Sequence, residues 1–207
     1  LYTKGRFFRR GSRSQSYNMS VQELVAGLIE VRSGRFLFCR HRTVSSSLAD
    51  SRGRDDNLKV NFVLVCLHGT AANHQQFLPF VSALEELVLS ANYGSGITLD
   101  CWMYDAVGCG GSPALDDADA YSDAEQIEDL MALLQNQVQT ENSRIFLLGH
   151  SYAPNWIYKF ILQQKDLMTS LSKPVDIAGL IIVCSGLHNE QLQMKKGGPT
   201  LFKAPLW

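Results

Sequence analysis

The stretch RIFLLGHSYAPNWIYKF, Arg144 to Phe160, places a serine where an apolar run changes into a pattern typical of a helix. The residues before Ser151 are typical of a buried strand, and those after it carry apolar residues at helical spacing. Ser151 therefore has two interpretations. A sharp strand-to-helix turn can present its hydroxyl as a nucleophile, or the hydroxyl can cap the helix that follows. These residues alone leave both open.

The residues around Ser151 suit the first interpretation in part. A serine hydroxyl is a poor nucleophile unless it is held near a base, and a strained turn at the carboxyl edge of a sheet can hold it there. Such a turn needs small residues on either side, because the strand and the helix approach closely. Gly149 meets this need, whereas Ala153 adds a methyl group at a crowded point. Pro154 is compatible with the first helical turn, where its missing N–H would be unpaired anyway.

Strand-like and helix-like segments alternate along most of the chain. Apolar runs predict strands over 58–69, 97–107, 144–150 and 176–186. Helical periodicity predicts helices over 74–94, 123–139 and 155–168. This alternation indicates right-handed βαβ units and an α/β fold, with a mainly parallel sheet and helices on both faces. In the first helix, six apolar residues share one face and are expected to be core: Phe77, Phe80, Val81, Leu84, Leu87 and Val88.

An antiparallel hairpin is predicted ahead of these units. The apolar runs 24–31 and 35–44 are separated only by Arg-Ser-Gly, which suits a tight connection between paired strands. A polar loop is predicted over 45–57. The hairpin would therefore add antiparallel strands to the sheet before its parallel part begins.

Composition indicates one globular domain. The chain has 207 residues, 45% of them hydrophobic, and a formal net charge of −1, which suits one substantial core. No apolar run reaches the roughly 18 residues that a membrane-spanning helix needs. We therefore expect no transmembrane segment, while peripheral contact with a membrane surface stays open.

Basic residues are concentrated at the start of the chain. Up to Lys59 there are 12 Lys and Arg against 5 Asp and Glu. Residues 1–20 are expected to form a basic, disordered tail, with a mitochondrial targeting segment as the alternative, and residues 21–207 form the folded domain. No nucleic-acid-binding motif accompanies the arginines, so we expect no nucleic-acid partner. The expected location is intracellular and cytoplasmic, or mitochondrial under the alternative.

Cysteine and histidine spacing argues against a metal site. Five cysteines form no CxxC pair, and five histidines show no metal-ligand spacing. The cysteines are typical of small buried hydrophobic residues in a reducing compartment. We expect no metal and no other cofactor.

A second motif, His68-Gly69-Thr70, comes directly after the first buried strand. Acyl transfer develops negative charge on the substrate oxygen, and a backbone N–H aimed at that oxygen is worth roughly 3 kcal/mol. The N–H groups of Thr70 and Tyr152 are placed to be two such donors. By itself, however, this tripeptide is also an ordinary turn at the end of a strand.

A third motif is the glycine-rich stretch YDAVGCGGSP, with Asp105, Gly108 and Gly110 in a D-x-x-G-x-G spacing after a predicted strand. The third glycine of a dinucleotide-binding fold is missing, and so is the Gly-Lys-Ser/Thr of a phosphate-binding loop. The stretch is therefore predicted to be a tight loop near the mouth of an active site.

Together the three motifs resemble the alpha/beta-hydrolase family, of the abhydrolase-domain type, over roughly residues 59–186. The resemblance implies a serine hydrolase that acts on a carboxylic ester, a thioester or a related acyl or lipid-like substrate. It implies Ser151 as the nucleophile, with Thr70 and Tyr152 as oxyanion-hole donors. It also implies supporting roles for His68, Gly69, Asp105, Gly108, Gly110, Gly149 and His150. Epoxide hydrolases and haloalkane dehalogenases of this family carry aspartate at the nucleophile position, and Ser151 disfavours both.

The segment after Gly186 departs from the family's pattern. The family places an acid and then a histidine on loops after later strands. Here 176–186 is the last predicted strand, and His188 and Glu190 lie too close together to fill both positions. We therefore expect a fragment with a lid region from about residue 187, without the catalytic acid and histidine, and inactive as it stands. A non-catalytic binding protein of the same fold and an acyltransferase are the alternatives.

Overall fold

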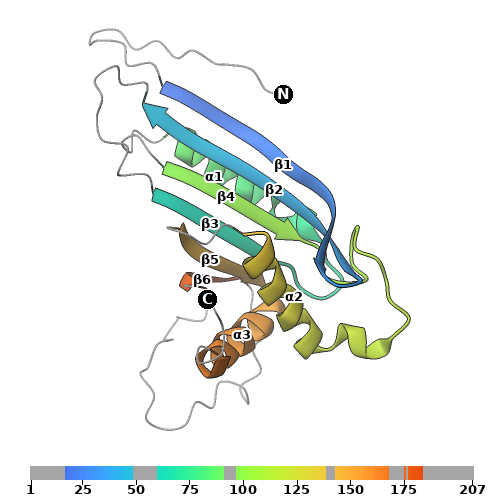
Figure 1. Cartoon of the computed structure of the whole chain (residues 1–207). Helices are drawn as coiled ribbons and strands as arrows, with labels where there is room; N and C mark the ends of the chain where they lie inside the picture. Colours follow the sequence, from blue (N-terminus) through green and yellow to red (C-terminus); the bar gives the residue numbers. More distant parts are fainter. Residues whose placement is uncertain are drawn as a thin grey trace, which may run out of the picture.

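A six-stranded mixed sheet organises the protein. The computed structural model describes residues 17–48, 60–90, 97–138, 143–167, 175 and 177–183. In these ranges the strands follow the order β1-β2-β4-β3-β5-β6. Figure 1 shows α1 behind this sheet and α2 and α3 in front of it. The α/β architecture with helices on both faces is confirmed.

The predicted hairpin consists of β1 (Tyr17–Arg32) and β2 (Arg35–Leu48), paired antiparallel. Gly34 in the turn has a φ of +72°, a conformation that suits glycine. Both strands are longer than predicted. β1 begins before the expected domain boundary at residue 21, and the polar loop predicted over 45–57 was wrong in its first part, which continues β2. Pairing explains this extension, because residues 39–46 of β2 also pair with β4.

The parallel part of the sheet has the four predicted strands: β3 (Val60–Leu67), β4 (Ile97–Tyr104), β5 (Ser143–His150) and β6 (Ile177–Val183). β4 and β5 flank β3 on opposite sides, and β6 pairs with β5. From β3 the chain moves to β4 on one side and then returns to β5 on the other side, so the strand order reverses at β3. In open α/β sheets, ligands bind outside the carboxyl ends of the strands at such a point. The loops that begin at His68 and Ser151 both lie at this position.

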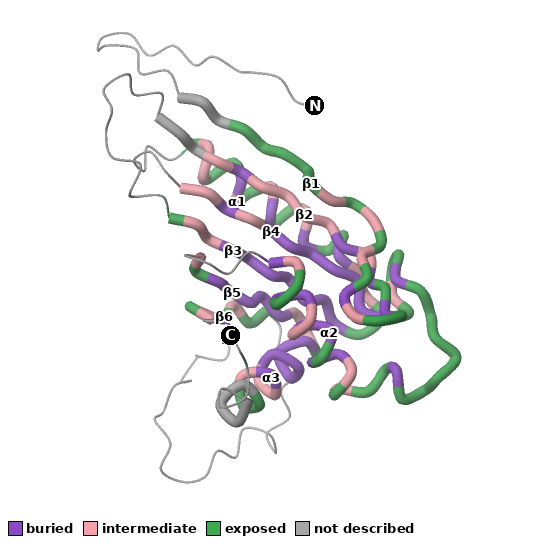
Figure 2. The backbone as a smooth tube through the Cα atoms, in the orientation of Figure 1, coloured by how far each residue is buried: buried purple, intermediate pink, exposed green. Residues whose placement is uncertain are grey.

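Three helices cover the two faces of the sheet. α1 (Leu78–Ser90) follows the short 3-10 helix η2 (His74–Phe77), and α2 (Asp123–Asn136) follows η3 (Ala118–Tyr121). α3 (Ala153–Leu167) follows β5 directly. Figure 2 shows that burial is greatest in the central strands and in the sides of α2 and α3 that face them. No helix in the described ranges combines the length and apolar character that crossing a bilayer requires.

The sheet separates two apolar cores. Alternate residues of β3 point to opposite faces, so Val65 packs toward α2 and α3 whereas Cys66 packs toward α1. The apolar face predicted for α1 is only partly correct. Val81 is buried, but Phe80 and Leu87 are 38% and 55% exposed. Glu85 is buried among the core residues instead, because it forms an ion pair with Arg42 of β2 at 2.7 Å.

Candidate active site

Ser151 lies in the turn between β5 and α3, with a backbone φ of +59°. Residues other than glycine rarely adopt this left-handed conformation, and those that do concentrate at functional sites. The Ser151 N–H donates to the Val183 carbonyl at 3.0 Å, which ties the turn to β6. Its hydroxyl forms no hydrogen bond with a described residue, and α3 begins only at Ala153. The geometry therefore does not fit a helix cap.

Gly149 lets β5 and α3 pack directly against each other. A Cβ at this position would lie 2.8 Å from Ile157 Cδ1 and 3.0 Å from Pro154 N, both too close for ordinary contact. Ala153, at the other small-residue position, is completely buried. The close approach of strand and helix that the sequence predicted around Ser151 is present.

Gly69 brings the loop after β3 against the Ser151 side chain. A Cβ at Gly69 would lie 2.6 Å from Ser151 Cβ and 3.1 Å from Ser151 Oγ. The loop turns sharply here, with a 3.2 Å hydrogen bond from Ala72 N–H to the Gly69 carbonyl and a φ of +57° at Ala71. Backbone, and not a side chain, therefore faces the serine.

The expected oxyanion donors belong to the two loops that meet at Ser151. Thr70 follows Gly69, and Tyr152 lies between Ser151 and the first residue of α3. Neither backbone N–H donates a hydrogen bond to another residue that the structure describes. Both side chains belong to exposed residues. The N-terminus of α3 adds a favourable dipole for negative charge at the same place.

His68 supports its loop through both ring nitrogens. Nε2 accepts a hydrogen bond from Ala106 N–H at 2.9 Å, so the proton of the neutral ring lies on Nδ1, which donates to the Gly69 carbonyl at 2.7 Å. Burial lowers the pKa of His68, although the Gly69 carbonyl and Asp105 oppose this. The ring is therefore neutral near pH 7, and neither nitrogen is available to Ser151.

Asp105 joins the glycine-rich loop to the residues that follow Thr70. Its buried carboxylate accepts hydrogen bonds from the His74 N–H at 2.6 Å, from His74 Nδ1 at 2.9 Å and from the Gly111 N–H at 2.8 Å. Gly110, with a φ of +52°, lies so close that a Cβ there would overlap the carboxylate. Gly108 also has a positive φ, of +71°. Positive φ at two positions gives a tight loop, as the spacing predicted.

No described histidine hydrogen-bonds to the serine hydroxyl. His41 and His74 are each paired with a carboxylate, at 3.0 and 2.9 Å. The Nδ1 atom of His150 is buried and has no hydrogen-bond partner among the described residues. His188 and Glu190, and the lid region expected from about residue 187, lie outside the described residues. Across the described ranges, no group of three or more potential ligand side chains could hold a metal ion.

Asp123 makes contacts around the site that sequence analysis did not predict. It accepts hydrogen bonds from Trp156 Nε1 at 2.8 Å and from the Tyr152 hydroxyl at 3.3 Å, and it forms an ion pair with Lys159. Trp156 and Lys159 lie on one face of α3, and Tyr152, directly before the helix, precedes Trp156 by four residues. That spacing is the only trace of the contact in the sequence, and it does not identify the acidic partner.

The sequence model of the alpha/beta hydrolase family matches residues 64–206, which is more than half of the chain. This chain belongs to the alpha/beta hydrolase family. The resemblance inferred from the three motifs is thereby confirmed at the level of the family and the fold. No curated protein matches the sequence.

Several solved structures resemble this alpha/beta hydrolase. A marine microorganism esterase is 19% identical, with a TM-score of 0.44 over 70% of this chain and 40% of its own. An epoxide hydrolase from Vigna radiata is 15% identical, with a TM-score of 0.47 over 78% and 39%. The peroxisomal alpha-beta-hydrolase of Saccharomyces cerevisiae is 13% identical, with a TM-score of 0.49 over 83% and 45%. These likenesses concern the fold alone, and the chain spans about two fifths of the length of each structure.

Proposed function

We propose that this protein is a serine hydrolase that acts on a carboxylic ester, thioester or related acyl substrate, with Ser151 as the nucleophile. The observation that carries the proposal is the arrangement around the serine. Its backbone is held at a positive φ, its hydroxyl lies close to Gly69, and the N–H groups of the neighbouring Thr70 and Tyr152 donate to no other residue that the structure describes. A partly accessible nucleophile next to backbone donors without a partner among the described residues is what acyl transfer requires.

In the proposed reaction, Ser151 Oγ attacks the acyl carbon and its proton passes to a base. The substrate oxygen, on which negative charge develops, accepts hydrogen bonds from the N–H groups of Thr70 and Tyr152. Collapse of this intermediate expels the alcohol or thiol, which takes up the proton and leaves an acyl-serine ester. Water then attacks the ester in the same way and releases the carboxylic acid. Each donor contributes about 3 kcal/mol to the barrier reduction.

The proposal assigns the base to residues outside the described ranges. Both nitrogens of His68 are engaged, and His41 and His74 are paired with carboxylates. His150, the other described histidine, makes no hydrogen bond to the Ser151 hydroxyl. Loss of one member of a catalytic triad removes about 10⁴ to 10⁶ of the rate in serine proteases. If the acid and histidine are not supplied by this chain, its turnover should be near background even with Ser151 and its donors in place.

The identity of the nucleophile separates this proposal from epoxide hydrolysis. Members of the family that open epoxides carry aspartate at the position of Ser151, and their covalent intermediate is an ester of that aspartate. A serine in this place instead forms an ester with the acyl group of the substrate. The proposed substrate is therefore a small acyl or lipid-like molecule.

A cytoplasmic location is proposed from the cysteines. Cys39, Cys66 and Cys101 are free and buried in the two cores. Buried thiols without disulfide partners suit a reducing compartment.

Covalent labelling tests the nucleophile. A fluorophosphonate should add once to the chain, and mass mapping should place the adduct on Ser151. Ser151→Ala should abolish the adduct, whereas Ser90→Ala, at an exposed serine of α1, should leave it unchanged. Added imidazole should accelerate labelling, because it supplies a base to the serine. An adduct that persists in Ser151→Ala, or a wild-type chain that does not react even with imidazole present, would show the proposal to be wrong.

A further inference from the structure

We propose that Asp123 is a positioning residue for the oxyanion hole, because it holds Tyr152 and thereby the direction of the Tyr152 N–H. The inference rests on the proposed function, since it assigns a task to a residue that touches no reacting atom. Asp123 is the first residue of α2, whereas the donor belongs to the residue before α3. The direction of the Tyr152 N–H would thus depend on α2 as well as on the turn before α3.

The Asp123 carboxylate binds one face of α3 through both of its oxygens. Oδ1 accepts the Trp156 indole N–H at 2.8 Å. Oδ2 accepts the Tyr152 hydroxyl at 3.3 Å and pairs with the Lys159 ammonium. The Tyr152 ring also packs edge-on against the Trp156 ring, with centroids 5.7 Å apart. Tyr152 is therefore held at its hydroxyl and at its ring, although 37% of the residue is exposed.

The direction of the Tyr152 N–H depends on the peptide that joins it to Ser151. On the Ser151 side, the N–H bond to Val183 and the positive φ fix the backbone. On the other side, the Tyr152 carbonyl accepts the Asn155 N–H at 3.0 Å. A side chain that is anchored as well leaves this residue little freedom to rotate. Removing the anchor would let the first turn of α3 fray and the N–H change direction.

Asp123 is itself held on a rigid support. Ser122 caps α2, accepting the Glu125 N–H at 3.4 Å. Farther along α2, the Asp129 carboxylate accepts hydrogen bonds from Arg35 of the hairpin, from Nε at 2.8 and 2.9 Å and from Nη2 at 2.7 Å. Asp123 therefore contacts Tyr152, Trp156 and Lys159 from α2, a helix that is fixed at its N-terminus and along its length.

The charge of Asp123 is compatible with this task. An unpaired carboxylate near the oxyanion would destabilise it by charge repulsion, but the Lys159 ammonium neutralises the charge of Asp123. Partial burial raises the pKa of Asp123, but the hydrogen bonds from Lys159 and Trp156 outweigh this and hold it below its usual value. The carboxylate thus stays ionised, and the Tyr152, Trp156 and Lys159 side chains can all donate to it.

The test compares Asp123→Ala with Asp116→Asn, which removes an exposed carboxylate from the loop before α2. Labelling of Ser151 in the 207-residue chain by a fluorophosphonate is measured over a range of probe concentrations, with imidazole present. We expect Asp123→Ala to lower the maximal labelling rate about tenfold or more, with the probe concentration for half-maximal rate changed less than about twofold. Asp116→Asn should match wild type. Trp156→Phe removes one donor to Asp123 and keeps an aromatic ring, so its maximal labelling rate should lie between those of wild type and Asp123→Ala.

The outcomes separate this inference from the proposed function. A wild-type chain that does not react at Ser151 overturns the proposed function and this inference with it. A reactive wild type whose Asp123→Ala variant labels equally fast overturns the inference alone. The inference is also overturned if the loss only matches the fraction of variant chains that are unfolded, measured by circular dichroism at the labelling temperature. A slower maximal rate in a fully folded variant supports the positioning role.

Discussion

At the scale of single residues, the contact between Gly69 and Ser151 allows the most direct prediction. The Cβ of Gly69→Ala would lie 2.6 Å from Ser151 Cβ and 3.1 Å from the His150 carbonyl oxygen, so the serine or the loop must move. A displacement of about 1 Å in a catalytic group can cost about 100-fold in rate. We expect labelling of Ser151 by a fluorophosphonate to fall by about that factor.

Gly27→Ala is the matched control for this substitution, because a Cβ at Gly27 would meet nothing within 4 Å. It should label like wild type and unfold within about 1 kcal/mol of it. Equal labelling of the two alanine variants would contradict the placement of Gly69 against the nucleophile.

Glu85 provides a prediction about pH. Burial raises the pKa of Glu85, despite its ion pair with Arg42, and its Oε1 atom has no hydrogen-bond partner in the part of the chain that the structure describes. When the pKa of a carboxyl is higher in the folded chain than in the unfolded chain, the protein becomes less stable as the pH rises from the lower pKa through the higher one. Glu85→Gln cannot lose a proton, so the stability of this variant relative to wild type should increase between about pH 4 and pH 7.

Urea unfolding at both pH values measures this difference, with Glu86→Gln at the exposed neighbouring position as the control. A relative stability of Glu85→Gln that falls with pH would mean that the pair with Arg42 outweighs the cost of burial.

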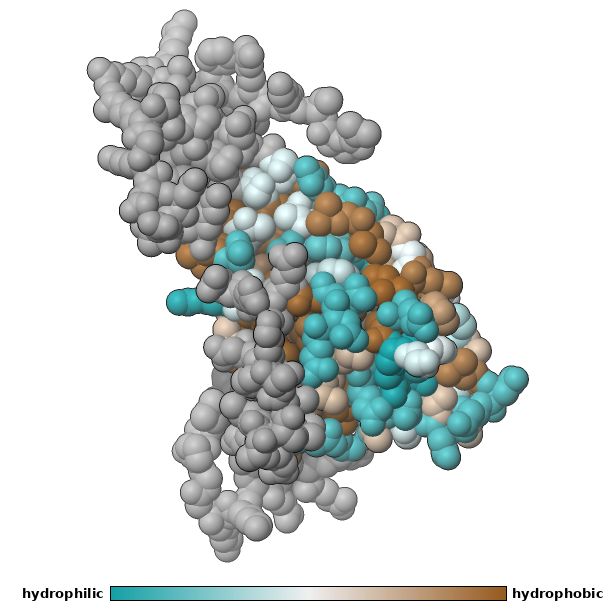
Figure 3. Space-filling model, in the orientation of Figure 1, coloured by the Kyte–Doolittle hydropathy of each residue, from teal (hydrophilic) through white to brown (hydrophobic). Residues whose placement is uncertain are grey.

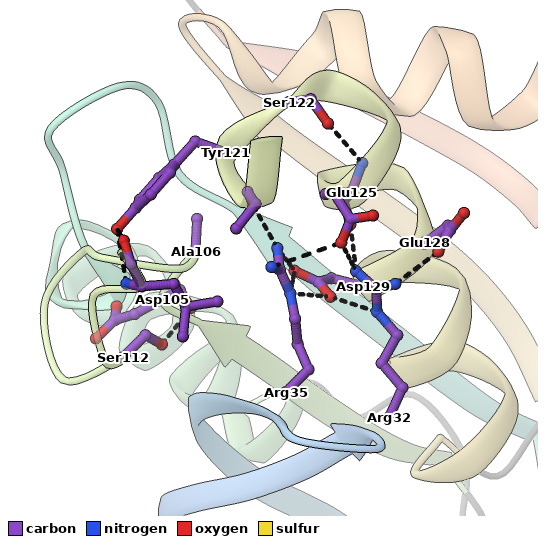
Figure 4. A network of polar contacts seen from close by, with 12 residues as sticks. Arg32, Arg35, Asp105, Ala106, Ser112, Tyr121, Ser122, Glu125, Glu128 and Asp129 are labelled. Carbon is purple, nitrogen blue, oxygen red and sulfur yellow. Dashed lines mark hydrogen bonds and ion pairs between the residues drawn. The ribbon is translucent and has the colours of Figure 1, made fainter. Parts of the chain in front are cut away.

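At the scale of elements, an ion-pair network joins the hairpin to α2 (Figure 4). Arg35 reaches the completely buried Asp129 at 2.7 Å, and Arg32 reaches the same carboxylate at 3.0 Å. On the face shown in Figure 3, hydrophilic side chains gather over the part of the molecule where α2 lies. The network therefore extends from solvent to a buried charge, and it connects segments 94 residues apart in the sequence.

We expect Arg35→Met to destabilise the protein by about 3 kcal/mol, because it leaves Asp129 buried with one fewer partner. Replacing both partners, as Arg35→Met with Asp129→Leu, should recover most of that loss, since no buried charge then lacks its partner. Urea unfolding of the two single variants and the double variant gives the coupling free energy. A double variant that shows the full sum of the single losses would argue that the two side chains do not interact.

At the scale of the whole molecule, the reactivity of buried cysteines can show whether the cores on the two faces of the sheet unfold together. Burial raises the pKa of Cys39 and of Cys101 to about 12. Cys39 belongs to the core under α2 and α3, and Cys101 to the core under α1. Thiolates are the reactive form, so neither should react with iodoacetamide until the chain unfolds. If the two cores unfold together, both cysteines should be alkylated at the same rate, as peptide mapping over time can show.

Cys109 is the internal control for this measurement, because it is only partly buried and should react first. A rate for Cys101 clearly faster than that for Cys39 would mean that α1 and its core open independently of the rest of the sheet.

Most elements of this fold could be predicted from the sequence, because their signals are local. Apolar runs marked β3, β4, β5 and β6, and a small residue two positions before Ser151 marked the close approach of strand and helix. The errors lie where tertiary contacts compete with local pattern. In α1, Phe80 and Leu87 are exposed where burial was expected. Glu85 is buried instead, because β2 supplies Arg42 as a partner that periodicity along α1 cannot indicate.

By itself, the sequence determined the alternation of strands and helices and the position of each motif at the end of a strand. Both follow from the spacing of apolar residues and from turn chemistry within a few residues. Only the tertiary structure decided that Gly69 meets Ser151, that both nitrogens of His68 are occupied, and that Asp123 clamps Tyr152. These contacts join residues on different elements. They depend on the order of the strands and the packing of helices across the sheet, which no local pattern encodes.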